Sequence, residues 1–187
     1  VAFRARCLRQ LRDAMQSHSE ELRELTIAEV GAPRFLTTLA QLDSPVEDLG
    51  YAADLAEGYE GWKVDLGAAK PAGVPSHRWV LREPAGVVGA ITPWNFPHQI
   101  NLAKVGPALA AGCTVVLKPA PDTPWAASAV AHLAATETDI PAGVLNVVNS
   151  SDHALGAVLS TDPRVDLVSF TGSTATGRKV MASAAET

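Results

Sequence analysis

The sequence predicts an α/β fold, a parallel β-sheet with helices on both faces that follows a set of N-terminal helices. From residue 78 onward, short apolar segments alternate with longer segments of helical spacing, and such βα alternation forms parallel sheets with right-handed crossovers. Before residue 78, apolar residues recur mainly at helical spacing. We therefore expect one domain, with a helical region over residues 1–77 and a βα-alternating part over residues 78–187.

One long amphipathic helix is expected over residues 1–30 of the helical region. Its apolar residues recur at three- and four-residue steps, and Gly31 and Pro33 end the pattern. Residues 63–75 are rich in Gly, Ala, Pro and Lys, a composition that predicts a connection with weak structure.

A second helical segment is expected over residues 34–62, with an interruption at Asp43-Ser44-Pro45. Ser44 has the side chain of a helix cap there, and Pro45 suits the first helical position. We therefore expect a new helix to begin at this point.

The rest of the chain is expected to alternate between strand and helix. Strands are predicted where β-branched and other apolar residues run together, and helices where the apolar spacing lengthens. The expected strands are residues 78–82, 87–91, 113–117, 144–148 and 165–170. The expected helices are residues 97–111, 123–136 and 151–160, with a last one from residue 173 onward.

Composition excludes several classes of protein. With 187 residues, 47% hydrophobic and 19% charged, the chain has the balance of a folded domain with a core. The net charge of -5 and the scattered basic residues argue against a nucleic-acid partner. No stretch approaches the ~20 apolar residues of a membrane span, so no membrane partner is expected.

The cysteines, the histidines and the chain ends carry three further expectations. Cys7 and Cys113 are too few for a disulfide framework, which indicates a reducing compartment, and we predict the cytoplasm. The histidines have no metal-ligand spacing, so no metal is expected. The chain begins without Met inside a helical pattern and stops at Thr187 inside another, so we expect a fragment of a larger protein.

Ligands of open parallel sheets bind beyond the carboxyl ends of the strands, which directs attention to four loops. After Phe170 the sequence TGSTATG opens a helix on Gly172 and Ser173. Free N–H groups at such a helix start can bind phosphate, and an ordinary Ser cap is the alternative. The usual G-x-G-x-x-G fingerprint of dinucleotide sites is absent from the sequence.

Two polar side chains in the other loops are candidates for ligand contacts. Lys118 ends a predicted buried strand, where it can donate to ribose or phosphate, or else lie in solvent. Asn95 stands in the loop PWNFP, where a bond to its own backbone is the ordinary role. Prolines that fix the loop, with Trp94 and Phe96 screening it from water, would instead make Asn95 a rigid oxyanion donor.

Four blocks of sequence resemble the aldehyde dehydrogenase superfamily, in order and at family spacing between residues 78 and 180. The blocks are GVVGAITPWNFP, GPALAAGCTVVLKPAPDTP, IPAGVLNVV and VSFTGSTATGRKV. The resemblance implies that the chain is an incomplete, Rossmann-like cofactor domain and that a catalytic domain lies outside it.

The resemblance also implies roles for individual residues. The catalytic residue Asn95 would hold the oxyanion of a thiohemiacetal with its side-chain amide. NAD, with NADP as the alternative, would bind across the strand ends, with Lys118 at the adenosine ribose and Gly156 by the adenine. The implied cofactor-binding residues are Ile91, Thr92, Pro93, Trp94, Lys118, Ala120, Gly156, Phe170, Thr171, Gly172, Ser173 and Thr176.

One position departs from the family pattern. The family often places a Glu three residues after the strand-end lysine to bind the ribose diol, but Pro121 stands there, with Asp122 next to it. The choice between NAD and NADP is therefore open. We predict NAD, because no Arg or Lys beside Lys118 offers a partner for a 2'-phosphate.

The implied activity is oxidation of an aldehyde to a carboxylic acid through a thioester. In the family, the nucleophilic Cys and the water-activating Glu follow the FTGS block and lie outside this chain, so the chain alone is expected to be inactive. Cys113 opens a buried strand with no base nearby and is expected to be structural. Two alternatives are a relative that makes acyl-CoA or reduces acyl phosphates, and a non-catalytic nucleotide-binding or assembly protein. The family usually forms dimers or tetramers, which implies a homo-oligomer.

Overall fold

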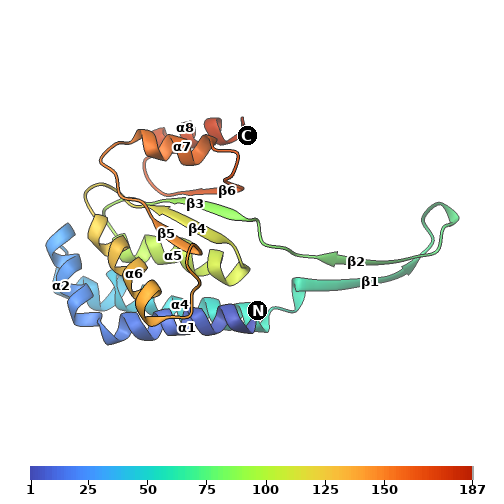
Figure 1. The fold of residues 1–187 in the computed structure, drawn as a ribbon, viewed down its shortest axis with the longest axis horizontal. Helices are drawn as coiled ribbons and strands as arrows, with labels where there is room; N and C mark the ends of the chain where they lie inside the picture. The colour runs from blue at the N-terminus through green and yellow to red at the C-terminus, as the bar shows by residue number, and fades with distance from the viewer. Residues whose placement is uncertain (187) are drawn as a thin grey trace.

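The computed structural model describes residues 1–186 and shows an α/β chain with one central sheet and a separate hairpin (Figure 1). The α-helices are α1 (Ala2–Ser17), α2 (Ser19–Val30), α3 (Arg34–Leu36), α4 (Asp43–Gly58), α5 (Pro97–Ala111), α6 (Pro124–Glu137), α7 (Ala154–Thr161) and α8 (Thr174–Ala184). Three shorter helical segments are the π-helical η1 (Thr37–Gln41) and the 3₁₀ turns η2 (Glu60–Trp62) and η3 (Pro71–Gly73). Across residues 1–186, no helix is both long and apolar enough to cross a membrane.

The central sheet is parallel and has the strand order β5-β4-β3-β6. Its strands are β3 (Val87–Ile91), β4 (Thr114–Lys118), β5 (Leu145–Val147) and β6 (Leu167–Phe170). The last residue of β3, Ile91, is in register with Lys118 of β4 and with Phe170 of β6. Three strands therefore end side by side at one edge of the sheet, as the βα alternation predicted.

Helices cover both faces of this sheet, in two layers on one face and in a single layer on the other. Helices α5 and α6 lie on one face, with α1, α2 and α4 packed beneath them, whereas α7 and α8 lie on the other face (Figure 1). We call the face covered by α5, α6 and the N-terminal helices the thick side, and the face covered by α7 and α8 the thin side. The largest buried side chains come from the thick side, including Leu8, Met15, Leu49 and Val105. No residue of α8 within the described part of the chain is buried. The predicted fold class is confirmed, and the core lies mainly between the sheet and the N-terminal helices.

The predicted single helix over residues 1–30 is wrong, because the chain bends at His18. His18 has φ -100° and ψ 17°, which ends α1 and lets α2 start at Ser19. Its ring nitrogens lie 3.2 Å from the Glu21 carboxylate and 2.8 Å from that of Glu137 on α6. The apolar spacing continues across the bend, so periodicity alone could not reveal it.

The bend brings the end of α2 against the start of α6. The Glu29 carboxylate accepts hydrogen bonds from the backbone N–H groups of Trp125, at 2.5 Å, and Ala126, at 3.0 Å. A helix start leaves such groups without partners in the helix itself. A side chain almost a hundred residues earlier in the chain thus completes the start of α6.

The second helical segment is also more divided than predicted. Helix α4 begins at Asp43 after the non-helical Leu42, so Ser44 is inside the helix and is not its cap. Arg23 holds this junction: its guanidinium donates to the Thr37 hydroxyl at 2.8 Å and to Asp43 at 3.0 Å. Arg23 is only 7% exposed. An ion pair between the buried Arg23 and the partly exposed Asp43 therefore holds the start of α4, and helix propensity does not reveal it.

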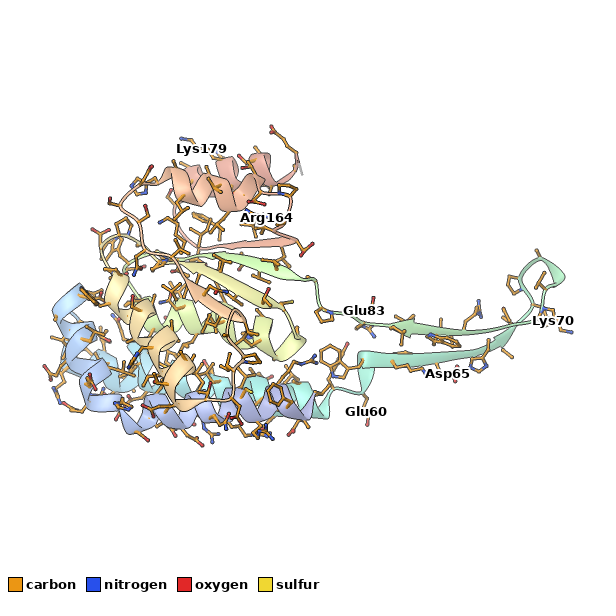
Figure 2. The ribbon with its side chains drawn as sticks, in the orientation of Figure 1. Glu60, Asp65, Lys70, Glu83, Arg164 and Lys179 are labelled. Atoms are coloured by element: carbon orange, nitrogen blue, oxygen red, sulfur yellow. The ribbon has the colours of Figure 1, made fainter. Side chains whose placement is uncertain are left out.

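The connection predicted over residues 63–75 is in fact half of a hairpin. Strand β1 (Lys63–Ala69) pairs antiparallel with β2 (Ser76–Leu81), and the ribbon extends away from the body of the molecule (Figure 1). Side chains leave both of its faces, with Asp65 and Lys70 far from the sheet (Figure 2). A strand with no buried face needs no alternation of apolar residues, which explains why the pattern missed it. The predicted boundary at residue 78 falls inside β2, and the domain division remains a prediction.

From residue 87 onward, the predicted alternation is confirmed with shifts of a few residues at the element ends. The predicted bounds of β3 and α5 are matched residue for residue. Helix α7 starts at Ala154, three residues later than predicted, because the Asp152 carboxylate accepts the Ala154 N–H at 2.8 Å. His153 therefore precedes the helix.

His98, in the first turn of α5, should make stability depend on pH. It is fully buried, and neither ring nitrogen has a hydrogen-bond partner within residues 1–186. Burial lowers the pKa of His98 to about 4, below the value of roughly 6.5 for an unfolded chain. Below pH 6.5, His98 binds a proton in the unfolded chain but stays neutral in the folded chain. The free energy of unfolding therefore falls as the pH drops from about 6.5 to about 4, in total by roughly 3 kcal/mol.

We expect His98→Leu to remove this part of the acid destabilisation. Denaturant unfolding at pH 7.5, 6, 5 and 4 should show a smaller loss of unfolding free energy for the variant than for the wild type. His132→Leu, at an exposed position of α6, is the control and should keep the wild-type dependence. Equal slopes for the wild type and His98→Leu would contradict the assignment.

Candidate functional site

One cleft of about 640 Å³ lies at the carboxyl ends of β3, β4 and β6. Pockets that bind small ligands typically measure about 300–1,000 Å³. All twelve residues predicted to bind a cofactor line this cleft: Ile91, Thr92, Pro93, Trp94, Lys118, Ala120, Gly156, Phe170, Thr171, Gly172, Ser173 and Thr176. The structure thus brings together residues from three of the four sequence blocks, with Gly156 of α7, and their role in binding remains a prediction.

Further residues of the cleft wall were not predicted from the sequence. They come from the loop after β4 and from the facing sides of α7 and α8: Pro121, Asp122, His153, Ala157, Ser160, Lys179, Val180 and Ser183. On α8, the cleft residues Thr176, Val180 and Ser183 recur at helical spacing. Extending that periodicity from Thr176 along the helix would have found them.

The turn between β6 and α8 presents a helix start to the cleft. Ser173 precedes α8, and its hydroxyl accepts the Thr176 N–H at 3.2 Å. The ordinary cap that the sequence allowed is therefore present. A Cβ on Gly172 would lie 2.5 Å from the Phe170 ring, so a larger residue in this turn would require that ring to move. The first N–H groups of α8 are left free for an anion.

Lys118 lies inside the cleft and not in solvent. Its side chain is 4% exposed, and its ammonium donates to the carbonyl of Pro119 at 3.2 Å. No carboxylate of residues 1–186 forms an ion pair with it. Burial lowers the pKa of Lys118 below its ordinary value, and the negative charge of Asp152 opposes that shift. A buried cation without an anionic partner is well suited to polar oxygens of a ligand.

Gly156 lines the cleft on the side of α7. A Cβ at this position would lie 3.8 Å from Cδ of Lys118 and 3.9 Å from Cδ1 of Ile91. These are ordinary contacts, so α7 packs directly over the Lys118 stem and the end of β3.

Asn95 lies beside the cleft but is not among the residues that line it. Its side chain is exposed and shows no hydrogen bond to any group in residues 1–186, so the bond to its own backbone is not formed. Trp94 is 55% exposed. The predicted screening of the loop from water is therefore wrong for this chain, since apolar neighbours in sequence do not fold over Asn95.

The Asn95 loop is nevertheless tied to the body of the molecule. The Thr92 hydroxyl donates to Oδ1 of the buried Asn101 on α5 at 2.7 Å. At the other end of the loop, the Asn95 carbonyl accepts from Nε2 of Gln41 at 3.4 Å. Gln41 belongs to η1, 54 residues earlier, and no local pattern in the sequence indicates this contact.

The two cysteines are buried and belong to a different part of the molecule. Cys7 and Cys113 are 5% and 6% exposed and line a small cavity of about 150 Å³ between α1 and the start of β4. Burial, with a smaller contribution from Asp139, raises the pKa of the Cys7 thiol. The structural role predicted for Cys113 agrees with its burial. Within residues 1–186, no three His, Cys, Asp or Glu side chains gather to hold a metal ion.

The fold and the cleft together define a class. A parallel sheet whose strand ends, buried lysine and helix start surround one cleft is an α/β protein of the doubly wound, ligand-binding type. The model of the aldehyde dehydrogenase family matches residues 1–187. The chain belongs to the aldehyde dehydrogenase family.

Individual relatives agree with this assignment. The mitochondrial succinate-semialdehyde dehydrogenase of Arabidopsis thaliana is 44% identical over 98% of the chain, and the NADP(+) succinate-semialdehyde dehydrogenase of Escherichia coli K12 is 43% identical over 95% of it. The crystal structure of an NAD-dependent aldehyde dehydrogenase from Sinorhizobium meliloti superposes over 99% of the chain, with a TM-score of 0.88 and 40% identity. The chain spans 34%, 36% and 36% of these three proteins. The resemblance and fold predicted from sequence are confirmed.

Proposed function

We propose that the whole protein oxidises an aldehyde to a carboxylic acid with NAD or NADP, and that this chain contributes the cofactor cleft and one oxyanion donor. The observation that carries the proposal is the convergence of the strand-end residues on one cleft with Asn95 at its edge. The family supports the reaction type. The matched relatives are named for aldehyde oxidation with NAD or NADP, and this comes to the present chain by similarity.

The cleft has the features needed for a dinucleotide. Lys118 offers a buried ammonium to hydroxyl or phosphate oxygens, and the start of α8 at Ser173 offers free N–H groups to a phosphate. Gly156 lines the cleft beside the Lys118 side chain, and we propose that the adenine binds near it. When bound, the nicotinamide would accept the hydride that leaves the substrate.

Asn95 would stabilise negative charge on the substrate oxygen. A thiolate from a part of the protein outside this chain would attack the aldehyde carbonyl, and the Asn95 amide would donate to the resulting oxyanion. Its N–H groups have no partner within residues 1–186 and are free to do so. Because the nucleophile comes from elsewhere, we propose that the 187-residue chain alone does not turn over aldehydes.

We expect Asn95→Ala in the whole protein to lower kcat by about 10²–10³-fold, the usual effect of losing one oxyanion donor. The dissociation constant for the cofactor should stay within about twofold, because Asn95 does not line the cleft. The assay is nicotinamide reduction with a panel of aldehydes that includes succinate semialdehyde. Asn149→Ala, an exposed asparagine in the loop after β5, is the control. Unchanged kcat in Asn95→Ala, or no reduction by a folded wild type, would overturn the proposal.

The cofactor preference is a separate proposal. We propose NAD, and two features of the cleft keep NADP as the alternative: Pro121 carries no carboxylate, and Lys179 of α8 lines the same cleft. The sequence argument considered only neighbours of Lys118 along the chain, whereas the structure adds a lysine from another helix.

We expect Pro121→Glu to weaken NADP binding by about tenfold or more relative to NAD, since a carboxylate would repel the additional phosphate. Isothermal titration of the whole protein with each cofactor measures the two dissociation constants. Pro121→Gln adds similar bulk without charge and serves as the control. Equal losses for both cofactors in both variants would show that position 121 does not face the ribose.

We further propose that the whole protein is a homo-oligomer that uses the hairpin β1–β2. An isolated two-stranded ribbon is at best marginally stable in water. This ribbon nevertheless exposes apolar side chains, with Leu66 51%, Trp79 50% and Leu81 53% exposed. Pairing with another copy would cover them.

We expect Trp79→Asn to lower the molar mass of the whole protein measured by light scattering at equal concentration. Tyr51→Asn removes an aromatic side chain that is 67% exposed from α4, outside the hairpin, and should leave the mass unchanged. A monomeric wild type, or equal masses for the wild type and Trp79→Asn, would contradict the proposal.

The cytoplasm is proposed as the compartment, supported by two buried, unpaired cysteines.

A further inference from the structure

Gln41 is a buried polar residue that the proposed reaction does not use. It is 4% exposed and ends the π-helical segment η1. Its Nε2 donates to the Asn95 carbonyl at 3.4 Å, while its Oε1 is buried without a partner in residues 1–186. An apolar side chain of the same length would avoid an unpaired oxygen, so stability does not explain an amide here.

The segment that carries Gln41 is fixed at both ends. Arg23 donates to Thr37, the first residue of η1, and to Asp43, the first residue of α4. Between these points the backbone leaves helical geometry at Leu39, with φ -124° and ψ -108°. The Arg23 ion pair thus anchors the segment from which Gln41 reaches the loop.

Near its centre, the Asn95 loop makes few other hydrogen bonds to the rest of the described residues. Pro93 and Pro97 have no N–H to donate, and the side chains of Trp94 and Asn95 are exposed. The peptide unit is planar, so a partner that holds the Asn95 carbonyl also fixes the direction of the Phe96 N–H on the opposite side. The orientation of the peptide between Asn95 and Phe96 therefore sets the direction in which the Asn95 side chain points.

We propose that Gln41 is a positioning residue, which holds the Asn95 carbonyl so that the Asn95 amide points to the reacting oxygen. The proposal rests on the function proposed above for Asn95. It assigns no contact with substrate or cofactor to Gln41, which is not among the residues that line the cleft.

The test compares two variants of the whole protein with a matched control. Gln41→Met keeps the length of the side chain and removes its hydrogen bonds, and Gln41→Glu keeps the shape but, when ionised, has no donor. Gln16→Met makes the same change at an exposed position of α1, where the amide donates to Glu47 at 2.5 Å. Labelling with 5-fluorotryptophan gives a ¹⁹F signal for Trp94, next to Asn95, that Trp94→Phe assigns.

We expect Gln41→Met to shift or split the Trp94 signal and to lower kcat by about tenfold to a hundredfold, since small misplacements of reacting groups have such effects. Gln41→Glu should change the Trp94 signal and kcat in the same way. The cofactor dissociation constant and the thermal midpoint of Gln41→Met should match those of the wild type, and Gln16→Met should change none of these quantities. A loss of kcat with a parallel loss of thermal stability in Gln41→Met would indicate a structural role and overturn the proposal.

The spectroscopic signal separates this inference from the proposed function. If the wild type oxidises aldehydes but Gln41→Met leaves both the Trp94 signal and kcat unchanged, Gln41 does not position the loop. If the wild type oxidises no aldehyde, the proposed function fails, and a shifted Trp94 signal in Gln41→Met still supports the tie between Gln41 and the loop. An unshifted signal in that case overturns it.

Discussion

The register of three parallel strands is the constraint on which the rest of the molecule depends. Ile91 pairs with Lys118 on one side and with Phe170 on the other, so three chain segments leave the sheet at the same level. Every loop that follows must turn above this edge, because helices cover both faces. The cleft exists because strands of the same direction end together and the helices that follow them diverge.

The helices on the two faces of the sheet have different roles. On the thick side, buried leucines and the Arg23 ion pair fix the helices that support the Asn95 loop from below. On the thin side, α7 and α8 bury few residues and line the cleft with Gly156 and Thr176. Rigid support and an accessible binding surface therefore come from opposite faces of one sheet.

Sequence reasoning succeeded where local pattern and local environment coincide. Strand β3 and helix α5 were placed to the residue, because a buried strand and a Pro-started helix have strong local signals. It failed at His18, in β1 and in η1, where the deciding contacts lie far away along the chain or where no face is buried. For the site, twelve cleft residues were predicted through the family resemblance, whereas the contact between Gln41 and the Asn95 carbonyl exists only in the tertiary structure.

The position of β6 has a consequence for how the chain is made. In the order β5-β4-β3-β6, the neighbour of β3 on one side is β6, the last strand in chain order within residues 1–186. Until residues 167–170 leave the ribosome, β3 presents an unpaired edge, which is the kind of surface that aggregates or pairs wrongly. The helices α1 to α6 can pack while synthesis continues, but the binding edge is assembled only when β6 returns to pair with β3.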